Sequence, residues 1–256
     1  MHLHLPKPIH GWRGFIGEVG IIVIGILIAL GAEEVLTEYN WSRKVEAGEA
    51  ALTLEAKTSS SAFAEEMTVG PCLIAQIDAL KGKVLAPDGP KNVVTSDSAR
   101  GQQVIRAPSR EFARDIWVSL LSDGTAAHMK AERRQSTNAY YAQFDQMYAS
   151  LPETDALMQR LTVLAEPAPL DSHSRFLALS DLVQLRSRVG LQILVSQQLL
   201  ATLRDLGRLP TTTEIDHYFS ESKRSGTVAF CNQRHLPLGN WRQMLSEQPI
   251  EKVPEA

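Results

Sequence analysis

The clearest chemical pattern in this sequence is a glutamate and a histidine three positions apart. Glu214-Ile215-Asp216-His217 is an E-x-x-H sequence, the spacing that places a carboxylate and an imidazole on one helix face in di-iron helical bundles. Such a site needs two copies, and the chain has only one. Glu214 also completes a T-x-x-E capping box with Thr211. A structural role at a helix N-terminus is therefore the better interpretation.

The other histidines have even weaker partners. His128 and Glu132 are four residues apart, and this single pair is no stronger evidence of a metal site than the first. His2, His4 and His10 are close together near the N-terminus, where a histidine cluster more often has no function than binds a metal. We therefore expect no metal and no other cofactor.

Catalytic signatures are also missing. The chain has no G-x-S-x-G, H-E-x-x-H, P-loop or G-x-G-x-x-G sequence, which are the usual entry points to hydrolases, zinc proteases and nucleotide-binding enzymes. This favours a non-enzymatic domain that senses, scaffolds or binds an unidentified protein partner. The alternative is an anchored periplasmic enzyme or small-molecule-binding protein whose site is assembled from distant positions.

Composition excludes several classes of protein. The 256 residues carry 26 Lys and Arg against 29 Asp and Glu, a net charge of -3, so no basic surplus is available for a phosphate backbone. Nucleic acid is therefore not an expected partner. Two cysteines allow one disulfide and exclude a four-cysteine zinc site.

The first forty residues contain a strongly apolar segment. Residues 19–32 read VGIIVIGILIALGA without a charge, and the extension back to Phe15 gives about 27 Å of helix, close to the thickness of the hydrocarbon layer. Trp12 and Trp41 would lie about 43 Å apart on a helix, which matches the spacing of the two headgroup regions. This predicts a transmembrane anchor over residues 15–36 and the lipid bilayer as a partner.

Two other interpretations of this segment stay open. A signal peptide cleaved before Ala32 would satisfy the small-x-small rule through Ala29 and Gly31, but the helical pattern continues past that point through Leu36 and Tyr39. A buried helix of a soluble protein fits less well, because an all-apolar helix without a polar face is unusual there.

The charges beside the segment predict its orientation. Lys7 and Arg13 precede it without an acid, whereas Glu18, Glu33, Glu34 and Glu38 are the only charged residues of positions 18–42. Because positive residues stay in the cytoplasm, we expect a cytoplasmic tail at 1–14 and an extracytoplasmic domain at 37–256. The chain would then be a single-pass protein of the cytoplasmic (inner) membrane.

The same residues carry a family resemblance. The run GEVGIIVIGILIAL, preceded by Phe15 and followed by acids and Trp41, resembles the N-terminal anchor of uncharacterised bacterial single-span membrane proteins. The resemblance covers residues 12–45. It implies a membrane anchor and a bacterial origin, and these families are domains of unknown function.

One face of the anchor carries small residues around an acid. Gly14, Glu18, Gly25 and Ala29 return to nearly the same helix angle, and small residues let membrane helices approach closely. We expect this face to mediate weak homo-oligomerisation with Glu18 shielded in the contact. A glutamate that merely reaches the headgroups is an equal alternative.

Beyond the anchor, apolar spacing predicts an all-α fold, an elongated helical bundle. The anchor helix should continue to about Met67 and break at Gly70-Pro71, before a short helix over 72–80. Residues 82–107 contain several Gly and Pro and are expected to form a flexible loop, more consistent with disorder than with a lid.

The second half of the chain predicts further helices. Ser109 should cap one that stops at Gly124. A second carries the aromatic stripe from Tyr140 to Leu151, which we interpret as core, and Pro152 should begin a third. The longest helix is expected over 171–206, ended by Gly207, and the capping box at Thr211 opens the last one. After Glu221 the regularity fades.

Cys72 and Cys231 are the only cysteines. If the domain lies outside the cytoplasm, it is in a compartment that oxidises thiols. We therefore expect a disulfide that ties the irregular C-terminal region to the bundle. The alternative is two buried free thiols that act as small apolar residues.

Overall fold

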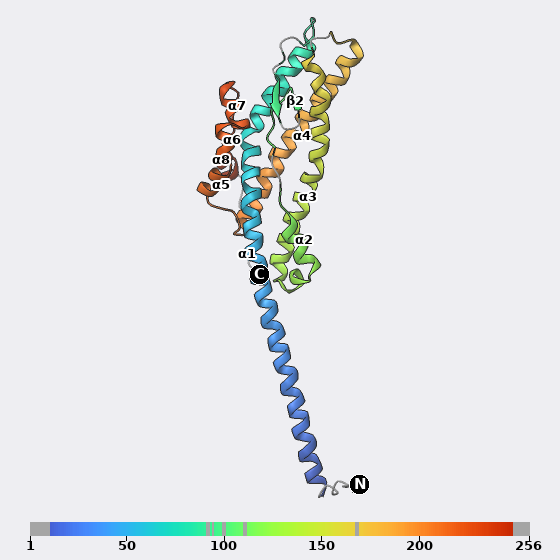
Figure 1. Ribbon diagram of the computed structural model, residues 1–256, viewed down its shortest axis with the longest axis vertical. Helices are drawn as coiled ribbons and strands as arrows, with labels where there is room; N and C mark the ends of the chain where they lie inside the picture. Colours follow the sequence, from blue (N-terminus) through green and yellow to red (C-terminus); the bar gives the residue numbers. More distant parts are fainter. Residues whose placement is uncertain are drawn as a thin grey trace, which may run out of the picture.

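A computed structural model describes residues 11–90, 93, 95–98, 101–109, 112–166 and 169–247. The chain forms an elongated helical bundle from which one long helix extends (Figure 1), so the expected all-α class is confirmed. His2, His4 and His10 lie outside the described residues. The elements are α1 (Gly11–Leu85), β1 (Ser96–Ser98), β2 (Gly101–Gln103), α2 (Asp115–Ser122), η1 (Thr125–His128), α3 (Ala131–Arg160), η2 (Leu161–Ala165), α4 (Ser172–Asp205), α5 (Thr212–Tyr218), α6 (Ser220–Arg224), α7 (Thr227–Gln233) and α8 (Trp241–Ser246).

Helix α1 has 75 residues and passes through Pro71, so the expected break at Gly70-Pro71 is wrong. Proline has no N–H and cannot donate to the carbonyl of Met67, four residues earlier. A segment from outside the helix lies against this turn of α1. The backbone N–H of Gly239 donates to the neighbouring Thr68 carbonyl at 2.8 Å, and a Cβ atom on Gly239 would lie 2.5 Å from the Met67 oxygen. A glycine-bearing segment therefore covers the proline site of α1.

Helix α3 likewise passes through Pro152, where a new helix was expected. Buried side chains lie on both sides of this proline: Phe144 and Met147 before it, Leu157 and Met158 after it. Packing on both sides keeps the two halves on one axis, and this outweighs the loss of one backbone hydrogen bond.

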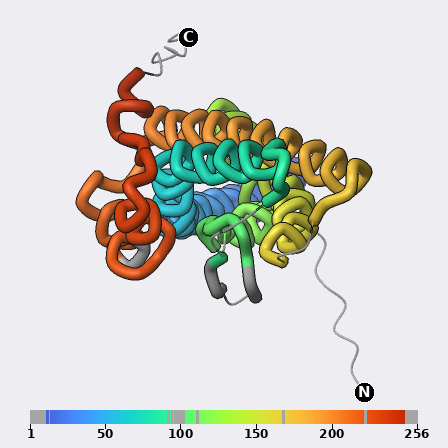
Figure 2. The backbone as a smooth tube through the Cα atoms, turned by 90° about the horizontal axis from the view of Figure 1, so that it is seen from above, coloured from blue at the N-terminus to red at the C-terminus, as the bar shows by residue number. Residues whose placement is uncertain are grey.

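The bundle core is formed by the C-terminal half of α1 together with α3 and α4. Figure 2 shows α4 running along one side of the bundle beside α1. The core has two clusters along the bundle axis. The cluster nearer the extended part of α1 includes Leu52, Phe63, Trp117, Tyr141, Phe144 and Leu199, and the distal cluster includes Leu73, Ile77, Ile105, Leu161, Leu182 and Val189. The aromatic stripe of α3 is thus mainly core, as expected.

Helix α4 matches its prediction at both ends. The Asp171 side chain accepts a hydrogen bond from the Ser174 N–H at 2.7 Å and caps the N-terminus. At the C-terminus Gly207 has a φ of 66°, and the N–H groups of Gly207 and Arg208 donate to the Arg204 and Leu203 carbonyls. This is a Schellman motif, which needs a left-handed residue and therefore favours glycine.

Helix α2 is shorter than expected. It begins at Asp115 rather than after Ser109, and Phe112 lies before it, stacked against Phe63. Its capping group comes from another element: the Glu55 carboxylate of α1 accepts from the Ile116 N–H at 3.0 Å. A cap supplied from α1 cannot be found by local spacing. The predicted stop at Gly124, which has a φ of 82°, is correct.

The expected loop over 82–107 is partly helical and partly packed. Helix α1 continues to Leu85, and β1 pairs with β2 in a short antiparallel hairpin. Val104 and Ile105 are buried, so flexibility is wrong for this end of the segment. The prediction for 91, 92, 94, 99 and 100 lies outside the described residues.

The C-terminal region contains more regular structure than the sequence indicated. The capping box of α5 forms as expected, with Thr211 and Glu214 exchanging hydrogen bonds. Three short helices, α6 to α8, then follow where we expected regularity to fade. Asn240 caps α8 by accepting from the Arg242 and Gln243 N–H groups, and Trp241 packs into the core beside it.

Candidate functional site

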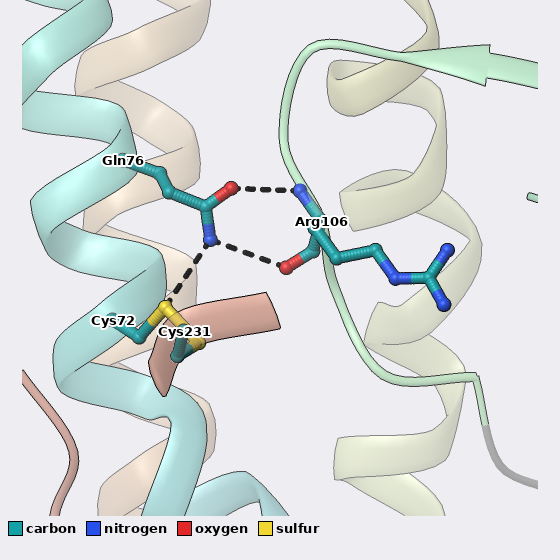
Figure 3. Close-up of a disulfide and its surroundings, with 4 residues drawn as sticks. All are labelled: Cys72, Gln76, Arg106 and Cys231. Carbon is teal, nitrogen blue, oxygen red and sulfur yellow. Dashed lines mark hydrogen bonds between the residues drawn. A yellow bond between two sulfur atoms is a disulfide. The ribbon is translucent and has the colours of Figure 1, made fainter. Parts of the chain in front are cut away.

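Cys72 and Cys231 form a disulfide with a Cα–Cα distance of 6.1 Å. It joins α7 to α1 beside the Gln76 amide (Figure 3). This amide pairs with the backbone of Arg106: the Arg106 N–H donates to Gln76 Oε1 at 2.8 Å, and Gln76 Nε2 donates to the Arg106 carbonyl at 3.2 Å. Two segments distant in the sequence, α7 and the segment around Arg106, are thereby fixed to one turn of α1.

A shallow hollow lies next to this junction. Its wall is mostly apolar, with Lys83 and Arg234 as its charged members; the lining is Gln76, Ala79, Leu80, Lys83, Val104, Phe230, Arg234 and Leu236. None of the described residues that line it has a carboxylate, an imidazole or a hydroxyl group. The described lining can accommodate an apolar group but supplies no acid–base pair for catalysis.

An ion-pair network around the buried Arg208 lies at the end of the bundle nearer the extended helix. Arg208, with only 2% of its surface exposed, pairs with Glu49 of α1 and donates to Thr137 Oγ1 of α3 at 3.0 Å. Arg133 of α3 also pairs with Glu49, at 3.1 Å. Burial raises the pKa of Glu49, but the hydrogen bonds and charges of Arg133 and Arg208 outweigh it and lower this pKa. The network links α1 and α3 to the turn after α4.

A second buried polar group surrounds Glu55. The Tyr141 hydroxyl donates to one carboxylate oxygen of Glu55, and the Ile116 N–H donates to the other. Burial, and then the hydrogen bond and charge of Glu55, raise the pKa of Tyr141. Burial also raises the pKa of Tyr140. Both phenols therefore stay protonated and enclosed, which suits a structural polar core rather than acid–base chemistry on a substrate.

The E-x-x-H pair does not form a metal site. Glu214 accepts from Lys57 Nζ at 2.8 Å and from the Thr211 N–H at 3.0 Å, and these bonds lower the pKa of Glu214 to about 2. Among the residues that the structure describes, no group of three His, Cys, Asp or Glu side chains could hold a metal ion.

His128 packs against a ring rather than beside Glu132. Its imidazole stacks on Trp41 with ring centroids 3.9 Å apart. The same Trp41 ring also contacts Lys44, whose Nζ lies 4.4 Å from the ring centre. An open groove runs from here along α1, lined by Leu30, Glu33, Glu34, Thr37, Glu38, Trp41 and His128. At Trp41 and His128 the bundle ends, and α1 continues beyond it alone.

The extended half of α1 has its apolar side chains in the open. Its large apolar residues from Trp12 to Tyr39 are all exposed. Within the described residues one helix is long and apolar enough to cross a membrane, and none of its most apolar stretch is buried. A signal sequence near the N-terminus has the same properties. The large exposed apolar side chains of this half are Trp12, Phe15, Ile16, Val19, Ile21, Ile22, Val23, Ile24, Ile26, Leu27, Ile28, Leu30, Val35, Leu36 and Tyr39.

The expected contact face of the anchor lies in this half. Glu18, Gly25 and Ala29 are on the exposed helix, and a Cβ atom on Gly25 would meet nothing within 4 Å. The face is therefore accessible along the helix. Its weak self-association stays a prediction.

Comparison with models of protein families, with curated proteins and with solved structures finds no match to this chain. The functional interpretation thus depends on the residues and geometry described above.

Sequence reasoning missed the two buried networks. Glu49, Glu55 and Arg208 are ordinary charged residues in helical or turn sequence. The one available signal was Gly207, which ends α4 and turns the next residue back toward the bundle. Local patterns do not show which residue lies opposite after such a turn.

Proposed function

We propose that this protein is a single-span membrane protein that holds a non-enzymatic helical domain outside the bacterial cytoplasmic membrane, where the domain binds a protein partner. The observation that carries the proposal is the continuity of α1. One 75-residue helix contains both the exposed apolar stretch and a principal helix of the bundle core. An apolar helix surface of this length is costly in water and stable in lipid.

The continuity of α1 also supports an uncleaved anchor. The helix passes without a break through Ala32, the position before which a signal peptidase would cut. The bundle begins only a few turns later, at Trp41, whose ring packs on His128. Helix and bundle would then share one rigid axis, and the bundle would be held directly above the headgroups.

Two features support an extracytoplasmic bundle. Lys7 and Arg13 precede the apolar stretch, and four acids follow its start, which is the charge asymmetry of a span with its N-terminus inside. The Cys72–Cys231 disulfide belongs to an oxidising compartment. These features are independent, because one lies in the anchor and the other in the domain.

A second candidate function is favoured by the hollow beside the disulfide. Its apolar wall, which includes Arg234, suits a small and mostly apolar molecule that carries a negative charge. In that case the protein would be an anchored small-molecule-binding protein. The buried groups around Arg208 and Glu55, by contrast, form hydrogen bonds within the protein, which supports the non-enzymatic interpretation.

Topology is tested by two fusions after Ala256, one to alkaline phosphatase and one to green fluorescent protein. We expect an active phosphatase and a dark fluorescent fusion. The opposite pair of results would contradict the topology. N-terminal sequencing of the protein extracted from membranes separates an anchor from a signal peptide, because a cleaved chain would begin at Ala32.

Partner binding is tested by affinity capture of the full chain from solubilised membranes, followed by mass spectrometry. The control is a variant with charges at exposed positions of the bundle, Val118→Glu with Val163→Glu, which should fold normally because both side chains are exposed. A protein captured in a fixed ratio by the native chain supports the proposal. Capture of a bound small molecule alone would favour the second candidate.

A further inference from the structure

The outward side of α4 carries an uncharged stripe over about five turns. Six residues follow one another at spacings of four and three: Phe176, Ser180, Val183, Ser187, Gly190 and Leu194. We call this set the α4 stripe. Phe176 is 68% exposed, Val183 51% and Leu194 45%. Leu177 and Leu191, which flank the stripe, are also exposed. Exposed apolar patches that are contiguous mark interaction sites more often than scattered apolar residues do.

The charged residues beside the α4 stripe are engaged within the same chain. Arg186 pairs with Asp78 of α1 at 3.0 Å, and Arg188 pairs with Glu153 of α3. Asp181 pairs with Arg160 of α3 at 2.9 Å. The stripe therefore presents an electrically neutral surface to a partner. A charged partner gains nothing there, whereas a second copy of the same neutral surface meets no like-charge repulsion.

The spacing of the α4 stripe suits packing of one helix against another. Phe176, Val183 and Gly190 are seven residues apart, and so are Ser180, Ser187 and Leu194, which corresponds to the a and d positions of a coiled coil. The large side chains of Phe176, Val183 and Leu194 are separated by small residues along the stripe. Small residues at Ser180, Ser187 and Gly190 let two backbones approach while the large ones fill the space between them.

We propose that the α4 stripe is the contact between two copies of this chain, with the two α4 helices parallel. The parallel orientation rests on the proposed function. If both anchors enter one membrane from the same side, the twofold axis lies along the membrane normal and each α4 runs in the same direction. Every stripe residue then meets its own counterpart.

The size of the α4 stripe indicates that the membrane contributes to this pairing. From Phe176 to Leu194 the stripe is about 28 Å long and about 10 Å wide, roughly 300 Å² per copy, against about 800 Å² per partner in a standard stable interface. The contact alone is therefore weak. Confinement of both copies to one membrane raises their effective concentration and compensates for the small area.

Because α4 lies between α1 and the second copy, the α4 contact is separate from any contact between the anchors. Helix α4 packs against α1 on its inner side, where a Cβ atom on Gly70 would lie 2.3 Å from Ile193. The second copy lies on the outer side. With helix axes 8–10 Å apart at each contact, the two α1 helices would be roughly 25 Å apart. The spans need not touch, and the face around Gly25 stays available for a separate contact.

Cysteine cross-linking of the full chain in its native membrane tests the proposal. Both native cysteines are in the disulfide, so a single introduced thiol reports its own position. Ser180→Cys should give a dimer band on mild oxidation. Ala142→Cys on the exposed side of α3 is the matched control and should give at least five-fold less. Equal yields at both positions would show random collision and overturn the proposal.

Further variants identify the surface and the orientation. In the Ser180→Cys chain, Leu191→Glu should reduce the dimer at least five-fold without lowering the melting temperature, because Leu191 is 57% exposed. Gly25→Ile should leave the dimer unchanged. An antiparallel pair would place the two copies of residue 180 about 15 Å apart. Cross-linking only between Ser180→Cys and Gly190→Cys chains would therefore contradict the parallel arrangement.

Failure of this proposal can be distinguished from failure of the proposed function. The same membranes are extracted with alkaline carbonate before cross-linking. If the chain is released, the anchor proposal is wrong. If the chain stays in the membrane and Ser180→Cys gives no dimer, the anchor stands and only the α4 contact is wrong.

Discussion

The two halves of α1 form one helix but differ in which side chains are buried: apolar side chains are exposed in the first half, and polar side chains are buried in the second. Residues 11–40 form the most apolar part of the chain, and their large apolar side chains are exposed. The half from Trp41 to Leu85 contains Ser59, Ser60 and Glu65, and these polar residues are buried. Burial within this protein therefore follows the presence of packing partners, not the hydrophobicity of the segment. The exposed half is suited to lipid as its surroundings, and the buried half to protein.

The largest expected effect comes from placing charges in the exposed half. The double change Ile24→Lys with Leu27→Lys should abolish membrane retention, because each lysine at the centre of a span opposes insertion by about 3 kcal/mol. The disulfide and the two core clusters lie far along α1 from these positions. Carbonate extraction measures retention, with Ile24→Val and Leu27→Ile as the control. Retention of the double lysine variant would show that this half is not a span.

In the buried half, loss of the disulfide should have the next largest effect. Cys72 and Cys231 are separated by 159 residues, and closure of so long a loop contributes about 4–5 kcal/mol in the chain-entropy model. The double variant Cys72→Ala with Cys231→Ala should lower the free energy of unfolding by an amount near this value. Denaturant unfolding in detergent measures it. A loss below about 1 kcal/mol would mean that Gln76 and the core hold α7 in place without the covalent bond.

The ion-pair network should have a smaller effect that depends on pH. Arg208→Met removes the buried positive charge that pairs with Glu49. It should destabilise the bundle by about 3 kcal/mol at neutral pH. Because the folded state lowers the pKa of Glu49 from 4.5, the stabilisation is complete above that value and is lost as the pH falls through the lower, folded pKa.

Unfolding as a function of pH tests this assignment. The native chain should lose stability below about pH 4.5, and the difference between the native chain and Arg208→Met should shrink over the same range. Arg133→Met is the control, because Arg133 is more exposed than Arg208 and should contribute about 1 kcal/mol or less. A difference that does not change with pH would contradict a role for the Glu49 charge.

The smallest effect should come from matched glycine substitutions in the two halves. A Cβ atom on Gly70 would lie 2.3 Å from the Ile193 side chain, whereas one on Gly25 would meet nothing within 4 Å. Gly70→Ala should therefore destabilise the bundle by about 1–2 kcal/mol through overpacking. Gly25→Ala should leave its unfolding unchanged. Equal effects would mean that Ile193 moves aside without strain.

A related variant tests the anchor face. Gly25→Ile fills the close-approach position and should reduce cross-linking between spans, while the melting temperature of the bundle stays the same. A thiol at Ile21 reports on the anchor and one at Ser180 reports on the α4 stripe. If Gly25→Ile reduces both cross-links equally, the two contacts are not independent.

The sequence alone determined the features that depend on neighbouring residues. The apolar stretch of α1, the stop at Gly207 and the box at Thr211 each follow from side-chain chemistry within one or two turns. The pairing of the cysteines was expected because the chain has only two. These local signals predicted an all-α chain with one exposed apolar helix.

Tertiary structure decided the features that depend on residues far apart in the sequence. Pro71 stays inside α1 because Gly239 covers its site, and α2 begins at Asp115 because Glu55 caps Ile116. Arg208 finds Glu49 only after the chain has folded back along the bundle. In each case a weak local preference for helix or turn competes with burial and hydrogen bonding by a residue distant in the sequence. The distant partner prevails, because an unsatisfied group in the core costs more than a weak helix position.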